Sequence, residues 1–261
     1  MAAVARTRGR SLSTVAGYGL PVLSFVVGIV LWQIAVTVFD VPSYLIPSPL
    51  AIAGVFTSGE INWVRHTLVT LNEALTGFVI GVIVGFAIAL VITVSATLNK
   101  ILMPYIVGLQ VLPKVAIAPV LYVMMGFSDA SRILLVVILT FFPIAINVST
   151  GLTDVDRNHV YLLRSLGAGN MTVFYKVRLP NSLPYFFDGL RIGVSGALVG
   201  AIVAEFVSSN SGLGFLILNS QYTFNTTAAF GAFVILTVIG LLLYASVVLL
   251  GRRLMPWYRA G

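Results

Sequence analysis

The stretch Asp154-Val-Asp-Arg-Asn-His-Val-Tyr-Leu-Leu-Arg-Ser-Leu-Gly-Ala-Gly-Asn170 opens the one polar, basic interruption of an otherwise apolar chain. The interruption continues to Arg191, and its basic residues are Arg157, Arg164, Lys176, Arg178 and Arg191. Lys and Arg gather in the cytoplasmic loops of membrane proteins. Long apolar segments flank this stretch on both sides, so we expect a cytoplasmic loop between two membrane spans.

The loop has a helical pattern of its own. Val160, Leu163 and Leu166 recur at the spacing of one helix face, and Gly167 follows them as a stop signal. A second short helix is expected to start at Thr172 and to end before Pro180, because a proline inside a helix clashes with the preceding turn. A short amphipathic helix on the wet side of a membrane is suited to docking into a partner.

Composition indicates an integral membrane protein. Of the 261 residues, 59% are hydrophobic and 9% are charged, whereas ordinary soluble domains carry about 25% charged residues. The chain has no cysteine, which excludes disulfides and thiolate metal sites. The net charge of +7 comes from residues near loop ends, and these are not interleaved with aromatic residues on one face. A membrane-orientation signal explains them, and we expect no nucleic-acid partner.

Six apolar segments are long enough to cross a bilayer as helices, so we expect an all-α, polytopic membrane protein. The segments are Tyr18 to Phe39, Thr70 toward Asn99, Ile101 to Met125, Ile133 to Leu152, Pro184 to Glu205, and Ala228 to Gly251. The first exceeds a signal-peptide core and is interpreted as an uncleaved span. The expected organisation is a basic tail over 1–17, a transmembrane domain over 18–251 with a loop at 154–187, and a second tail over 252–261.

The basic residues fix the orientation of these spans. With both termini inside the cell, twelve of the fifteen Lys and Arg lie on the cytoplasmic side. They are Arg6, Arg8, Arg10, Lys100, the five loop residues, Arg252, Arg253 and Arg259. Only Arg65 and Arg132 fall outside, and Lys114 lies within a span. This bias predicts a multi-pass membrane protein with cytoplasmic termini.

Small residues repeat every four positions in two of the spans. Such repeats line one helix face and let a second backbone approach closely, which is how helices associate in lipid. One repeat is Gly77, Gly81, Gly85 and Ala89; the other runs along the fifth span on two faces, Gly189, Gly193, Ala197, Ala201 and Gly196, Gly200, Ala204. We predict tight packing at both repeats and a central position for the fifth span.

Three polar residues are candidates for the translocation pathway. Lys114 lies near the middle of the third span, between Pro113 and Pro119, and Asn147 lies inside the fourth. An ammonium at that depth costs about 2.5–3.5 kcal/mol on insertion scales, so it should face protein or water. Lys114 either lines the pathway or bonds carbonyls that the prolines leave free. Glu205, at the outer end of the fifth span, either forms a gate or bonds nearby backbone and hydroxyl groups.

Motifs for catalysis and nucleotide binding are missing from the sequence. There is no Gly-x-x-x-x-Gly-Lys-Ser/Thr phosphate loop, no His-Glu-x-x-His and no Gly-x-Ser-x-Gly. His66 and His159 fall in loops on opposite sides of the membrane. Gly212-Leu-Gly214 is interpreted as an external turn and not as an anion site. The chain is therefore not expected to be an enzyme or to hold a cofactor.

Several pieces together resemble a known family. Arg164-Ser-Leu-Gly-Ala168, Val177-Arg-Leu-Pro180, Leu183-Pro184 and Asp188-Gly-Leu-Arg191 are similar to the cytoplasmic Glu-Ala-Ala loop of permease subunits in binding-protein-dependent ATP-binding-cassette importers. Tyr161-Leu-Leu163 stands where the family has its Glu-Ala-Ala triplet. Pro113-Lys-Val-Ala-Ile-Ala-Pro119, Gly126-Phe-Ser128, Phe141-Phe-Pro143 and Leu45-Ile-Pro-Ser-Pro49 resemble the nitrate, sulfonate, taurine and vitamin-precursor branch.

The resemblance implies a type I importer permease that carries a small solute. It implies a homodimer, two cytoplasmic ATPase subunits that bind ATP and Mg²⁺, and an external substrate-binding protein. The residues it assigns to ATPase coupling are Leu163, Arg164, Ser165, Leu166, Gly167 and Ala168. An ion-gradient-driven secondary transporter is the alternative, but it would need midplane acids or a repeat of broken helices. A membrane enzyme is a third possibility, which the missing motifs disfavour.

Overall fold

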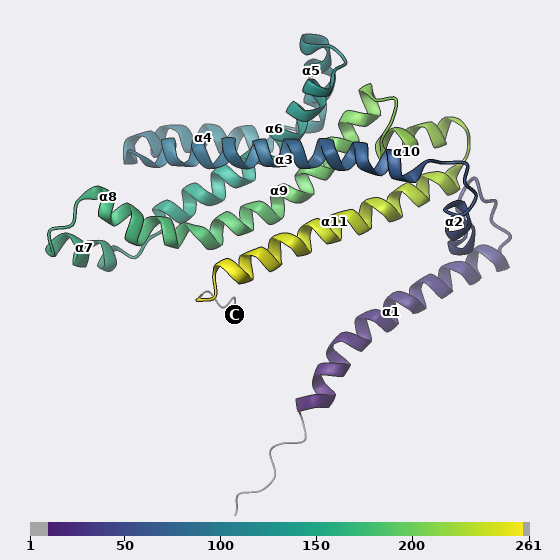
Figure 1. Cartoon of the computed structure of the whole chain (residues 1–261), viewed down its shortest axis with the longest axis horizontal. Coiled ribbons are helices and arrows are strands. Elements are labelled where there is room, and N and C mark those ends of the chain that lie inside the picture. The colour runs from purple at the N-terminus through teal and green to yellow at the C-terminus, as the bar shows by residue number, and fades with distance from the viewer. Residues whose placement is uncertain (1–9, 258–261) are drawn as a thin grey trace, which may run out of the picture. The chain divides into compact units, whose positions relative to one another are not determined.

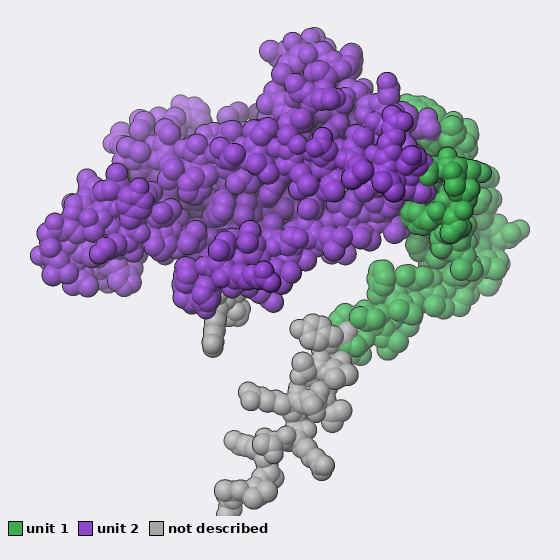
Figure 2. Space-filling view, in the orientation of Figure 1, with its two compact units in different colours: residues 1–61, 220–231 green, residues 62–219, 232–261 purple. Residues whose placement is uncertain are grey.

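The computed structural model describes residues 10–257, and those residues form helices with no strand among them (Figure 1). Arg6, Arg8 and Arg259, which support the expected orientation, lie outside the described residues. Two compact units make up the chain, residues 1–61 with 220–231 and residues 62–219 with 232–261 (Figure 2). The all-α prediction is confirmed for the described part of the chain.

Unit 1 contains α1 (Arg10–Val38) and α2 (Pro49–Val55). α1 begins before Tyr18 and so includes part of the expected tail. α2 starts where the sequence favours a helix start: the Ser48 hydroxyl accepts a hydrogen bond from Ala51 N–H, and Pro49 supplies a first residue that needs no donor. Within the unit, the Trp32 and Phe230 ring centroids lie 5.9 Å apart.

Unit 2 holds the long helices. α3 (Trp63–Thr93), α6 (Asp129–Thr153) and α9 (Leu179–Ser208) run side by side, with α6 packed against both others (Figure 1). α10 (Leu213–Tyr222) and α11 (Thr226–Leu254) follow α9, and both cross into unit 1. Length and composition qualify five helices as membrane spans, and a sixth span results when one bent pair is counted as one.

The small-residue repeats form the contacts of α6, as predicted. A Cβ placed at Gly81 of α3 would lie 2.7 Å from Cβ of Thr140, and one at Gly85 would lie 2.7 Å from the Phe141 carbonyl oxygen. From the other side, a Cβ at Gly200 of α9 would lie 2.9 Å from Cα of Val136. Side chains longer than hydrogen would therefore push α3 and α9 away from α6.

The third span, expected as one helix over Ile101 to Met125, is broken into two helices. α4 (Ala96–Val111) stops at Leu112, and a 3₁₀ turn (Lys114–Ile117) leads into α5 (Ala118–Met125) at an angle of 84° to α4. Leu112 has an extended ψ of 138° because the ring of Pro113 disfavours a helical conformation in the residue before it. The prolines thus break the span instead of bending it.

The second half of the loop also differs from the prediction. No short helix ends before Pro180; α8 (Asn170–Val173), a π-helical turn (Phe174–Arg178) and α9 form one helical run from Asn170 to Ser208. In the π turn, Leu179 N–H bonds the Phe174 carbonyl, five residues earlier. Pro180, which has no N–H to donate, follows directly, and the widened turn lets the helix continue through it. The fifth span therefore starts well before Pro184, and the loop proper ends near Gly169.

Candidate functional site

The predicted docking helix is α7 (Arg157–Ser165). Its first turn is capped by the Asp156 carboxylate, which accepts a hydrogen bond of 2.8 Å from Asn158 N–H. Its last turn is closed by Gly167, whose φ of +81° lies in the left-handed region. Gly167 N–H bonds the Arg164 carbonyl, and the next residue's N–H bonds back into the helix as well. The predicted glycine stop is confirmed.

α7 exposes apolar side chains. Leu166 is 76% exposed and Leu162 is 60% exposed, as is the ring of Tyr161 beside them. Leu163, expected to join the same surface, is half-buried and faces inward. A leucine and a tyrosine on this nine-residue helix, with a second leucine directly after it, face solvent, which is typical of a surface that a partner covers.

The other predicted coupling residues hold the shape of the loop. The Arg164 guanidinium donates a 2.7 Å hydrogen bond to the Asn170 side chain, which joins the end of α7 to the start of α8. Ser165 Oγ bonds the Leu162 carbonyl within α7, and Ala168 is half-buried after the turn. Hydrogen bonds of Arg164 and Ser165 thus fix the shape of this segment. The role of the six residues in ATPase coupling stays a prediction.

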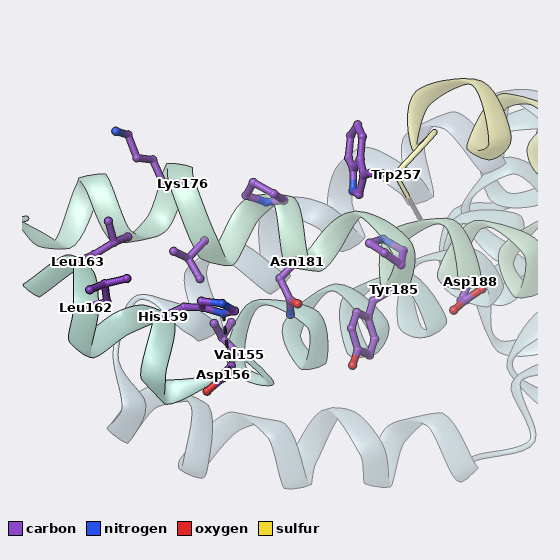
Figure 3. Close-up of a pocket in the computed structure, with 13 residues that line it drawn as sticks. Val155, Asp156, His159, Leu162, Leu163, Lys176, Asn181, Tyr185, Asp188 and Trp257 are labelled. Carbon is purple, nitrogen blue, oxygen red and sulfur yellow. Dashed lines mark ion pairs between the residues drawn. The ribbon is translucent and has the colours of Figure 1, made fainter. Parts of the chain in front are cut away.

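A groove of about 830 Å³ lies behind α7 (Figure 3). One wall is formed by His159, Leu162 and Leu163 of α7, and the other by the π turn and the start of α9. Its remaining lining residues are Val155, Asp156, Lys176, Val177, Pro180, Asn181, Pro184, Tyr185, Asp188 and Trp257. The groove separates α7 from the long helices, so α7 stands out from the helical body.

Two side chains of α9 anchor the start of the loop. Asn181 donates hydrogen bonds of 2.8 Å to the carbonyls of Gly151 and Asp154, and the Tyr185 hydroxyl donates one of 2.8 Å to the Asp154 carboxylate. These bonds tie the last turn of α6 to α9. A force on the loop would therefore reach α6 and α9 together.

The structure does not bring the three pathway candidates together. Lys114 Nζ lies 5.2 Å from the centroid of the Phe142 ring, at the break of the third span. Asn147 donates a 2.7 Å hydrogen bond to the Pro143 carbonyl of its own helix. Within residues 10–257, no hydrogen bond or ion pair joins any two of Lys114, Asn147 and Glu205. Their role in the pathway stays a prediction.

Glu205 has the contacts of the second of its two interpretations. Its side chain is 1% exposed, Oε1 accepts a 2.6 Å hydrogen bond from the Thr70 hydroxyl, and Oε2 accepts one of 2.5 Å from Gly214 N–H. Thr70 belongs to α3, and Gly214 lies at the start of α10. The Gly212-Leu-Gly214 segment, interpreted as a turn, contributes to this site and starts α10.

Sequence reasoning missed an ion pair near Glu205. Arg132 of α6 donates a 2.7 Å hydrogen bond to Glu73 of α3 and one of 3.0 Å to the carbonyl of Ser208 at the end of α9, and it also contacts Asp129. The Arg132 and Glu73 side chains are 13% and 6% exposed. Opposite charges at the same end of two apolar spans were the signal that could have paired them.

Comparison with known proteins bears on what this geometry serves. Residues 77–260 match the family described as binding-protein-dependent transport system inner membrane component. This chain belongs to that family. The permease is thus a membrane component of an ATP-binding-cassette importer, a transport subunit and not a catalytic enzyme.

Relatives cover most of the permease. A probable ABC transporter permease of Haemophilus influenzae is 36% identical over 87% of this chain and 93% of its own. The formylaminopyrimidine transport permease ThiX of Halalkalibacterium halodurans is 32% identical over 91% of this chain and 95% of its own. The riboflavin transport permease RibX of Chloroflexus aurantiacus is 34% identical over 92% of this chain and 90% of its own.

The fold of the permease matches a solved transporter. The methionine ABC transporter MetNI, in inward-facing conformations, contains a chain that is similar with a TM-score of 0.65 at 20% identity, over 75% of this chain and 98% of that one. The prediction of a type I importer permease fold is confirmed by this similarity.

Proposed function

We propose that the permease forms a homodimer that encloses the solute path, and that two cytoplasmic ATPase subunits bind its α7 helices. The carrying observation is the exposed apolar surface of α7, ended by a left-handed glycine and held away from the helical body by a groove of about 830 Å³. ATP and Mg²⁺ bind to the partner ATPase. Closure of the ATPase pair moves α7, and the long helices rock between inward-facing and outward-facing states.

Each coupling residue has a separate task in this proposal. Leu162 and Leu166 enter a socket on the ATPase, while Leu163 packs into the groove and keeps α7 from rolling. Arg164 holds the turn between α7 and α8 through Asn170. A force on α7 thus passes into the helix that begins at Asn170.

We further infer the location and the cargo. The protein lies in the cell (inner) membrane with both termini cytoplasmic, and an external binding protein delivers its solute. The solute is a sulfonate, nitrate or a vitamin precursor such as a pyrimidine or riboflavin, with the last two supported by the names of two relatives. Lys114 and Asn147 line the path, and Lys114 attracts the anionic members of this set.

The test is capture of the ATPase by the permease. Leu166→Asp places a charge on the exposed surface of α7 and should abolish copurification of an ATPase subunit and ATP-driven uptake. Leu45→Asp is the control, because Leu45 is 59% exposed in the connector between α1 and α2. Full ATPase capture by Leu166→Asp, or loss of capture by both variants, contradicts the proposal.

A further inference from the structure

Three consecutive backbone N–H groups at the start of α10 donate to side chains of two other helices. Two acceptors come from α3 and one from α9, so the contacts join three helices at one point. The pairs are Gly212 N–H to His66 Nδ1 at 3.1 Å, Leu213 N–H to Thr70 Oγ1 at 2.8 Å, and Gly214 N–H to Glu205 Oε2 at 2.5 Å. We call these six residues the α10 joint.

The core of the α10 joint is buried, His66 at its edge is half-buried, and Thr70 links its neighbours in series. Thr70 and Leu213 are fully buried, and Glu205 is 1% exposed. The Thr70 hydroxyl accepts from Leu213 and donates its proton to Glu205 at 2.6 Å, so one side chain connects α3, α9 and α10. Buried groups that lose such partners keep the full cost of desolvation.

Glycine is required at the joint for two reasons. Gly212 has a φ of +111°, and a Cβ there would overlap the Glu205 carboxylate. A Cβ at Gly214 would lie 2.8 Å from the Ile202 carbonyl oxygen of α9. The segment Gly212–Gly214 therefore lies too close to α9 and the Glu205 carboxylate to carry side chains at either glycine.

The joint lies at the far end of a single helical run from α7. The run from Asn170 to Ser208 has 39 residues, which at 1.5 Å per residue is roughly 58 Å long. It starts beside α7, and Glu205 lies in its last turn (Figure 1). Arg132 holds the same last turn to α6 and α3 through Ser208 and Glu73.

We propose that Glu205 is a positioning residue that makes α10 move as one body with α3 and α9. Movement of α7 then displaces the helical run from Asn170 to Ser208. Because the α10 joint holds α10 to the far end of this run, α10 is displaced with it. The joint is a feature of the chain itself, and only its drive by an ATPase rests on the proposed function.

The first test measures order in α10 directly and needs no ATPase. In Glu205→Ala, we expect the Gly214 amide to exchange hydrogen at least about tenfold faster, because it loses its acceptor in a buried site. The amides of residues 212 and 213 keep their acceptors on α3 and should exchange faster only because α10 is less firmly held. Glu60→Ala is the matched control, since Glu60 is an exposed acid. Glu205→Gln retains an acceptor oxygen and should fall between. Unchanged exchange in Glu205→Ala overturns the joint.

The second test restores the position of α10 without the carboxylate. The His66 and Phe215 rings are stacked with centroids 6.2 Å apart, and the chain has no cysteine, so His66→Cys with Phe215→Cys allows a specific link between α3 and α10 through a short bifunctional thiol reagent. Because His66→Cys removes the acceptor of Gly212 N–H, uptake is compared only among proteins that carry both cysteines, with and without the reagent. In the complex with its ATPase, Glu205→Ala should lower uptake at least about tenfold while ATP hydrolysis continues. Linking should restore uptake to within about threefold of the linked protein that keeps Glu205.

The outcomes separate the two proposals. If the link stops uptake in a double-cysteine protein that keeps Glu205 and that transports before linking, α10 has to move relative to α3 and the inference is wrong. Failure of the link to rescue Glu205→Ala, with the exchange of residues 212–214 restored, is equally contrary to it. If ATP drives no uptake in the unmodified complex, the proposed function fails, and the exchange measurement still decides the joint. If Glu205→Ala does not assemble, Glu205→Gln with and without the link gives the same comparison.

Discussion

The two ends of the long helices are built in opposite ways. At the α10 end, polar groups are buried and each of the three α10 amides has a partner on another helix. At the α7 end, a groove of about 830 Å³ separates α7 from α9, and apolar side chains face solvent. Buried hydrogen bonds fix geometry because leaving one unmade is expensive. Exposed apolar side chains fix no geometry within the chain, and only contact with another surface would bury them.

The two ends differ in how many contacts between helices the chain itself supplies. Helices α3, α6, α9 and α10 are joined at one end by Glu73, Thr70, Arg132 and Glu205. At the other end, α7 is connected to the body by a short loop and the Asp154 and Asn181 contacts. The polar groups at the α10 end thus have partners within the chain, whereas the apolar side chains of α7 face solvent.

Removing Arg132, the buried cation at the α10 end, should have the largest effect. Arg132→Ala leaves Glu73 buried without its partner, and breaking a buried pair costs about 3–5 kcal/mol. We expect a large loss of folded protein and a lower thermal midpoint in detergent. Replacing Glu73 and Arg132 together by Gln should recover part of that stability. Equal stability of Arg132→Ala and the native protein would show that the packing at the α10 end does not depend on this pair.

Widening the helix contact should have the next largest effect. Gly81→Leu forces α3 away from α6, where Thr140 lies in contact, and overpacking costs about 1–3 kcal/mol. The amount of assembled complex should fall in size-exclusion chromatography. Gly108→Leu is the matched control, since Gly108 is a helical glycine with open space around it. A similar loss in both variants would point to insertion and not to packing.

Substitution of Gly167, which ends α7, should affect only the α7 end of the molecule. Gly167→Val forces a branched residue to a φ of +81°, at a cost of about 1–2 kcal/mol. Membrane insertion should be normal, while uptake and ATP hydrolysis become uncoupled. Gly169→Val is the control in the same loop, because Gly169 has an extended φ of −77° and no neighbour within 4 Å of a Cβ. Normal solute-stimulated ATP hydrolysis and uptake in Gly167→Val would remove α7 from the coupling path.

The smallest effect is expected at Lys114, which belongs to neither end. Lys114→Gln loses a contact with Phe142 worth about 0.5–1 kcal/mol. We expect normal yield, a severalfold lower uptake of an anionic solute, and unchanged uptake of a neutral one. Competition between the two solutes in vesicles measures the difference. Equal uptake of both would assign Lys114 to structure instead of the pathway.

Much of the structure of α7 and of the helix packing could be predicted from the sequence. The apolar spacing of Leu163 and Leu166 and the stop at Gly167 predicted α7, because these are local patterns within one helix. The repeats containing Gly81 and Gly200 predicted close contacts without naming the partner, since small residues state only that something approaches. Pro180 misled the prediction, because a π turn accommodates a proline and leaves no clear mark in the sequence.

The sequence by itself determined the membrane class, most of the helical spans and the presence of α7, because hydrophobicity, charge bias and periodicity depend on neighbouring residues along the chain. Only the tertiary structure decided that Arg132 pairs with Glu73 and that Glu205 receives the start of α10. Those partners are 59 residues apart in the first case and 9 in the second. A buried polar group requires some partner, but which one it finds depends on how the helices pack.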